Sequence, residues 1–242
     1  MEDGRLPAQT YEGNRSFFAA VAERELTGPG YSAAIVPACP DRSVLNCLSY
    51  RDVAALEQAL PAVADAYEHA GVRAWTVWVP EADRAAAELL AAAGHRLDGA
   101  PEAMGMTLGA TPEAAVAEEA ADTTPVGPIN DAAYGYDGSF TVALAPDLGQ
   151  PGMRTYLAGD DACVVTLDVD HDCHVGLVAT RPEAQRRGLA GGLLAGALAA
   201  ARKRGQRTTT LIASGAGRPV YERLGYRPLG AIQMWERRAG TT

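Results

Sequence analysis

The residues best suited to bind an anion lie in segment 180–190, where an expected strand passes into an expected helix. Pro182 disfavours a helical conformation at the residue before it, so the strand must end there. Gly188 removes a Cβ at the turn into the helix and leaves several backbone N–H groups unshielded and unpaired. The helix dipole, Arg186 and Arg187 all add positive potential. The sequence therefore predicts a site for a phosphate or pyrophosphate.

Two motifs in this part of the chain resemble those of one enzyme family. The spacing Gln185-x-x-Gly188-x-Ala190 resembles the Q/R-x-x-G-x-G/A loop of the GNAT superfamily of N-acetyltransferases, which cradles the pyrophosphate of acetyl-CoA. A second segment resembles the family's N-x-x-A-x-x-L-Y-x-x-x-G-F signature: Ser214-x-x-Gly217-x-x-Val220-Tyr221-x-x-x-Gly225-Tyr226. It departs from the signature at Ser214 and Gly217, where the family has Asn and Ala. The resemblance covers about 153–236, and the first half of the chain resembles the fold only in outline.

The resemblance implies acetyl-CoA as a co-substrate that enters where two neighbouring strands separate. The strand backbone would pair with the pantetheine arm, as an added strand would, and the loop amides would hold the pyrophosphate. It assigns cofactor contacts to Val178, Ala179, Thr180, Gln185, Arg186, Arg187, Gly188, Leu189, Ala190 and Ser214. Some of Arg186, Arg187 and Arg218 would meet the other phosphates, and Tyr221 would lie beside the sulfur.

Acetyl transfer to an amine needs a deprotonated amine, a donor for the oxyanion and a proton for the sulfur. A backbone N–H near Val178 could supply the donor, and Tyr221 could supply the proton, because a phenol is neutral at pH 7. The alternative for Tyr221 is a purely structural role in the core. The base stays open between Asp168, Asp172 and His174, or the amine arrives deprotonated.

The hydrophobic periodicity predicts a succession of helices and strands. The resemblance to the GNAT family implies that they form an α/β (α+β) fold with a mixed, mostly antiparallel sheet flanked by helices. We expect helices at 11–26, 52–70, 82–93, 188–203 and 219–224, strands at 31–37, 43–49, 74–79, 103–108, 153–158, 162–169, 173–179, 208–213 and 230–236, and a linker at 110–128.

The order of elements repeats, which favours two tandem GNAT-like domains. GVRAWTVWVP at 71–80 aligns with GQRTTTLIAS 134 residues later, and AGHR at 93–96 aligns with LGYR 131 residues later. We expect a degenerate domain at 1–121 and an acetyl-CoA-binding catalytic domain at 122–242. The first domain has Leu90 at the position of Tyr221 and lacks a phosphate loop. It either forms a wall of the acceptor site or serves as a structural partner.

The composition argues against several classes of protein and partner. Four cysteines in 242 residues do not suit a disulfide scaffold, and no apolar run is long enough to span a membrane. The acidic, polar start is unlike a signal peptide, so we expect a cytoplasmic protein with reduced cysteines. Arg and Ala richness is typical of a GC-rich bacterial genome. The basic residues form no nucleic-acid-binding module, so neither nucleic acid nor a membrane is expected as a partner.

A metal site is not expected. Asp168, Asp170 and Asp172 have the first spacings of a calcium loop, but Cys173 and Ala179 stand where that loop needs Gly and Glu. The sequence thus predicts an acyltransferase that moves an acetyl group from acetyl-CoA to a primary amine, either a small molecule or an amino terminus. The alternative is a non-catalytic acyl-CoA-binding or regulatory module. The sequence assigns neither the amine nor the oligomeric state.

Overall fold

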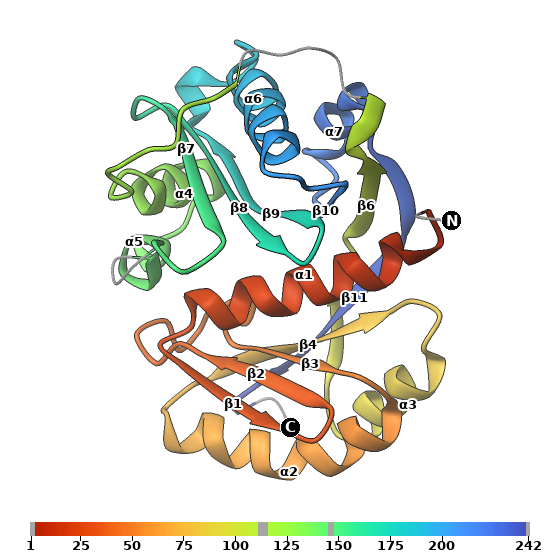
Figure 1. The fold of residues 1–242 in the computed structure, drawn as a ribbon. Helices are drawn as coiled ribbons and strands as arrows, with labels where there is room; N and C mark the ends of the chain where they lie inside the picture. The colour runs from red at the N-terminus through yellow and green to blue at the C-terminus, as the bar shows by residue number, and fades with distance from the viewer. Residues whose placement is uncertain (1–2, 111–115, 145–147, 241–242) are drawn as a thin grey trace. The chain divides into compact units, whose positions relative to one another are not determined.

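The computed structural model describes residues 3–110, 116–144 and 148–240 (Figure 1). The chain forms two compact units: unit 1 contains Met1–Phe17 and Glu102–Leu229, and unit 2 contains Phe18–Pro101 and Gly230–Thr242. These ranges do not follow the expected boundary between residues 121 and 122, because each unit includes a segment from the other half of the sequence. Helix α1 (Leu6–Val21) and strand β11 (Arg227–Arg238) contribute residues to both units.

Unit 1 is built on a five-stranded sheet with the order β6-β10-β9-β8-β7. Strands β9 and β10 are parallel and the other neighbours are antiparallel. The elements are β6 (Glu102–Thr107), α4 (Val126–Tyr134), α5 (Ser139–Leu144), β7 (Met153–Ala158), β8 (Ala162–Val169), β9 (Asp172–Thr180), α6 (Leu189–Lys203), β10 (Thr208–Ala213) and α7 (Arg218–Leu224), with 3-10 turns at Asp3–Arg5, Leu108–Ala110 and Pro182–Ala184.

Helices cover both faces of this sheet. On α6, Leu194, Leu198 and Ala201 recur at helical spacing and pack in one buried cluster with Val164 of β8. Adjacent residues of a strand point to opposite faces of the sheet, so Cys163, the neighbour of Val164 in β8, points to the other face. On that face Cys163 accepts a hydrogen bond from Asn130 of α4, at 3.4 Å. Helices α6 and α4 therefore lie on opposite faces, and the sheet between them is buried.

The sheet of unit 2 has the order β1-β2-β3-β4-β11, and β5 also pairs with β11. This arrangement matches the sheet of unit 1 when that sheet is followed from β7 to β6. Among the described strands of this unit, β3 and β4 are parallel and the other neighbours are antiparallel. Leu56, Val63 and Tyr67 of α2 and Leu90 of α3 pack on the sheet. The elements are β1 (Arg24–Gly28), β2 (Tyr31–Ile35), β3 (Cys47–Tyr50), α2 (Val53–His69), β4 (Ala74–Pro80), α3 (Arg84–Ala92) and β5 (Arg96–Gly99).

The expected fold class of mixed, mostly antiparallel sheets flanked by helices is confirmed. The helix predicted at 11–26 is wrong at both ends, because α1 begins at Leu6 and ends at Val21. Residues 24–28 instead form a hairpin with β2, in which Gly30 adopts a φ of 80° that favours glycine. Pairing in that hairpin outweighs the helical periodicity of the segment. Strand β5 and helices α4 and α5 were not predicted.

The expected linker at 110–128 is wrong at its C-terminal end, where α4 begins at Val126. Its residues 111–115 lie outside the described residues. None of the helices in the described part of the chain is both long and apolar enough to cross a membrane.

Candidate active site

The last part of the loop between β9 and α6 presents backbone amides that have no partner among the described residues. After the 3-10 turn, Arg186 has a φ of 62° and Gly188 a φ of 79°. Gly188 is the N-cap of α6, and no side chain caps this helix. Among the described residues, no group accepts a hydrogen bond from the backbone N–H groups of 186–191. Together with the helix dipole, these donors form the anion-binding geometry that the sequence predicts.

Strands β9 and β10 separate beside this loop. They pair only from Asp172 to Val175 of β9 and from Thr208 to Leu211 of β10. At the same point β9 has a bulge, because Val175 and Leu177 pair with successive residues of β8 and Gly176 is left over. A Cβ at Gly176 would overlap the Phe17 ring of α1, so the close approach of α1 requires glycine here.

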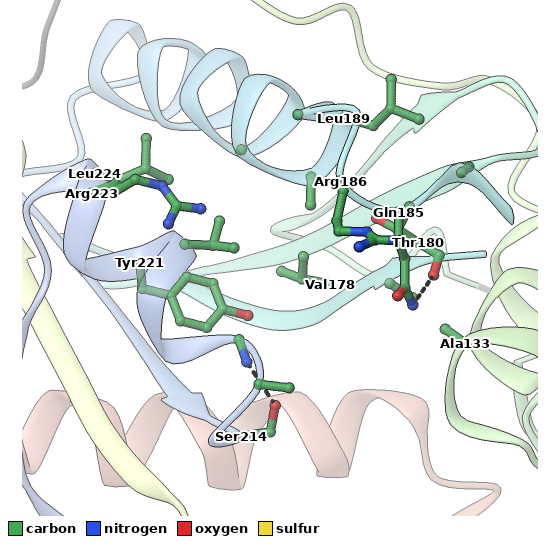
Figure 2. Close-up of a pocket in the computed structure, with 18 of the residues that line it drawn as sticks. Ala133, Val178, Thr180, Gln185, Arg186, Leu189, Ser214, Tyr221, Arg223 and Leu224 are labelled. Atoms are coloured by element: carbon green, nitrogen blue, oxygen red, sulfur yellow. Dashed lines mark hydrogen bonds between the residues drawn. The ribbon is translucent and has the colours of Figure 1, made fainter. Parts of the chain in front are cut away.

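A cavity of about 560 Å³ opens where the strands separate (Figure 2). Its wall contains nearly all of the predicted site residues: Val178, Ala179, Thr180, Gln185, Arg186, Gly188, Leu189, Ala190, Ser214 and Tyr221. The structure thus brings together residues from β9, the loop, the end of β10 and α7. Their roles toward a cofactor stay a prediction.

The arginines predicted to contact phosphates differ in whether they already have an acidic partner. Arg187 does not line the cavity and forms a 3.1 Å ion pair with Asp161. Arg218 also lies outside the lining, between Glu102 at 2.6 Å and Glu222 at 2.7 Å. Arg186 does line the cavity, together with Arg223, which the sequence reasoning did not single out. In the part of the chain that the structure describes, neither has an acidic partner.

Tyr221 reaches the cavity from α7. Its ring is buried edge-on to Tyr226, with 5.9 Å between centroids, and its hydroxyl points toward Val178 (Figure 2). Among the described residues that hydroxyl has no hydrogen-bond partner. Burial raises the pKa of Tyr221 above its ordinary value, and the neighbouring Tyr134 adds to the shift. The phenol is therefore a neutral donor over the whole physiological range.

Gly217 explains one departure from the family signature. A Cβ at this position would lie 3.0 Å from Cε2 of Tyr221, closer than ordinary van der Waals contact. The alanine that is usual there would push the ring, so glycine at position 217 allows the ring of Tyr221 to lie where it does. Ser214 accepts a 3.2 Å hydrogen bond from the amide of Gly217 through its Oγ and holds the turn before α7.

The side chains considered as the base lie elsewhere. Arg204 holds Asp168 through two hydrogen bonds of 2.7 and 3.0 Å. Asp172 is buried and accepts from the hydroxyl of Thr210 at 2.6 Å. His174 is also buried, with Nδ1 3.1 Å from that hydroxyl.

Burial lowers the pKa of His174 to about 3 and raises the pKa of Asp172. Asp168, Asp172 and His174 all belong to the described residues, and none of them lines the cavity. Across the same described residues, no three His, Cys, Asp or Glu side chains come together as metal ligands.

Two polar residues of the cavity wall were not predicted from the sequence. Arg223 follows Tyr221 by two positions, so its place on α7 was readable from the second motif. Tyr134 of α4 lies in segment 122–150, which carries no motif and of which 145–147 lie outside the described residues. Its position depends on how α4 packs on β8 and β9, which no local pattern reports.

A family model described as acetyltransferase (GNAT) domain matches residues 140–236, which include the cavity residues from β9 to α7. Residues 140–236 thus match a GNAT acetyltransferase domain. Among curated proteins, none has significant sequence similarity to the chain.

Solved GNAT structures share the fold over nearly the whole chain. A GCN5-related N-acetyltransferase from Kribbella flavida is 18% identical, with 96% of each chain covered and a TM-score of 0.66. One from Sphaerobacter thermophilus is 16% identical, covering 98% of this chain and 92% of that one, with a TM-score of 0.57. A tandem GNAT protein from the clavulanic acid biosynthesis pathway is 14% identical, covering 88% and 79%, with a TM-score of 0.59. The chain therefore has a GNAT fold.

Proposed function

We propose that this protein transfers an acetyl group from acetyl-CoA to a primary amine, either a small molecule or an amino terminus. The observation that carries the proposal is one cavity that combines three features. Amides at the start of α6 and a phenol that points at the edge of β9 have no partners among the described residues, and that edge is open where β10 leaves it. GNAT acetyltransferases use acyl-CoA, and each feature suits one part of that molecule.

The residues present fit a CoA thioester. The amides of 186–191 suit the pyrophosphate, and the space that a Cβ of Gly188 would take is open, so an anion can approach the backbone. The backbone of Val178, Ala179 and Thr180 suits the pantetheine amides by strand addition. Arg186 and Arg223 supply charge for the phosphates, in place of Arg187 and Arg218, which already have acidic partners.

The chain's own groups then support direct transfer. The amine nitrogen attacks the thioester carbonyl carbon, a C–N bond forms, and the C–S bond breaks as the tetrahedral intermediate collapses. A backbone N–H near Val178 stabilises the oxyanion. Tyr221 donates its proton to the departing sulfur and regains one from solvent, while the nitrogen loses its proton to water. No side chain in the cavity is assigned as the base.

We propose unit 2 as a degenerate copy of unit 1. Supporting this, both units have the same strand order, and the aligned pairs Trp75–His95 and Thr209–Tyr226 are both in contact. The N-terminus of α2 carries Asp52, whose carboxylate accepts from the amide of Ala55 at 2.9 Å. A carboxylate already occupies the place where a pyrophosphate would bind, so unit 2 would not hold acetyl-CoA in this way.

Two measurements on the full chain test the proposal. Titration calorimetry with CoA and acetyl-CoA should show binding. Release of CoA from acetyl-CoA should then require an amine from a panel of glycine amide, ethanolamine, putrescine and a short peptide with a free amino terminus. Binding without turnover on any amine would favour the non-catalytic acyl-CoA-binding module. An absence of binding would refute both readings.

A further inference from the structure

Tyr134 contacts the proposed acyl-transfer site from the helix opposite α6. It is the last residue of α4 and lines the cavity. Its hydroxyl donates a 3.0 Å hydrogen bond to the backbone carbonyl of Val178. In a strand the N–H and C=O of one residue point the same way. The Tyr134 hydroxyl therefore lies on the side of β9 to which the N–H of Val178 points.

Because of that hydrogen bond, the hydroxyl of Tyr134 can only accept a hydrogen bond from a ligand. A phenol has one O–H proton, and here the proton is given to Val178, so only the oxygen lone pairs remain. Burial raises the pKa of Tyr134, so the group stays neutral and keeps its proton on that carbonyl. The hydroxyl of Tyr221, by contrast, has no hydrogen-bond partner among the described residues and can donate its proton. The cavity thus presents one phenol as an acceptor and a second as a donor.

The acceptor is held in place by a short, well-bonded segment. Gly135 ends α4 with a φ of 68°, and the Asp131 carboxylate accepts from the amides of Phe140 and Thr141 at 2.9 Å each. The ring of Tyr136 stacks on Tyr134 at 5.8 Å and on Phe140 at 4.9 Å. Half of Tyr134 is nevertheless exposed, so a ligand can reach it.

We propose that Tyr134 binds the amine nucleophile, with Oη accepting a hydrogen bond from an amine N–H beside Val178. The inference rests on the proposed acetyl transfer and identifies the group that positions the acceptor substrate. A neutral amine has both an N–H to donate and a lone pair to attack, so one N–H on Tyr134 leaves the lone pair free for the thioester carbon. An ammonium ion could bind in the same place but has no lone pair, so the unprotonated amine is the reactive form.

Tyr134→Phe tests this, with Tyr136→Phe as the matched control. Each variant removes one hydroxyl from the same pair of stacked rings. In Tyr134→Phe we expect the KM for the fastest amine of the panel to rise about tenfold, since a lost hydrogen bond of about 1.4 kcal/mol corresponds to that factor. The Kd for acetyl-CoA should not change. Tyr136→Phe should leave both values within twofold of the wild type.

Each other result overturns the inference. An unchanged amine KM in Tyr134→Phe would remove Tyr134 from substrate binding while leaving the acetyl transfer of the wild type intact. A tighter Kd for acetyl-CoA would instead make Tyr134 a competitor that the pantetheine arm displaces from the Val178 carbonyl. If the wild type turns over no amine of the panel, the proposed function itself fails, and the role of Tyr134 fails with it.

Discussion

Gly188 offers a direct test of the anion-binding loop, because a single methyl group can be added there without a steric clash. No heavy atom lies within 4 Å of the position that its Cβ would take. The backbone, however, has a φ of 79°, and an L-residue pays about 1–2 kcal/mol in that region. Gly188→Ala should therefore lower the melting temperature by about 2–8 °C. If the variant loses more CoA-binding free energy than folding stability, the additional loss must come from contacts between the loop and the ligand.

Gly192, one turn further along α6, is the matched control. Its Cβ position is also open, its φ is ordinary, and it does not line the cavity. Gly192→Ala should raise stability by about 1 kcal/mol, since alanine is the better helix former. By calorimetry, Gly188→Ala should bind CoA at least about tenfold more weakly and Gly192→Ala should bind as the wild type does. Gly188→Asp, which places a carboxylate against the pyrophosphate, should abolish binding. Wild-type affinity in Gly188→Ala would refute the loop as the anion site.

Three further predictions concern the sheet and the phenol. Tyr221→Phe should lower kcat by about 10²–10⁴ with little change in the Kd for acetyl-CoA, and a wild-type kcat would remove it as the acid. Gly176→Ala should destabilise the protein by about 1–3 kcal/mol in urea unfolding, because its methyl group overlaps Phe17; the double variant with Phe17→Leu should recover part of that loss. His174 is neutral when folded, so its contribution to stability is full above an unfolded pKa of about 6.5 and is lost as pH falls toward its folded value of about 3. His174→Gln should flatten the fall in unfolding free energy between pH 6.5 and 4, and an unchanged slope would contradict that origin.

The sequence was most informative where local chemistry decides the backbone. Pro182, Gly188 and the spacing to Tyr221 placed the end of a strand, the start of a helix and a cavity wall. It was least informative where partners far along the chain decide. Arg187 carries the same charge as Arg186, and only the fold shows that Asp161 takes one and leaves the other facing the cavity.

The candidate bases illustrate the same limit. His174 has a suitable intrinsic pKa, but alternation along β9 directs its side chain away from the α6 face, where Val175 packs. There it is buried and hydrogen-bonded to Thr210. Whether a titratable side chain is buried follows from the register of the whole sheet and the helix that covers it. The residue type alone gives only its ordinary pKa.

The difference between the two units can be reduced to how the central helix begins. In unit 2 the strand passes into α2 through Asp52, whose carboxylate accepts from the first turn and caps the helix. In unit 1 the same step uses Gly188, which has no side chain to cap the helix. A glycine at the N-cap costs only about a few tenths of a kcal/mol of stability compared with a good side-chain cap. Because the loop also holds Arg186, which is not a glycine, at a positive φ of 62°, unit 1 has two destabilising features at one turn. Such strain is expected where a ligand supplies the missing interactions, which favours unit 1 as the unit that binds the cofactor.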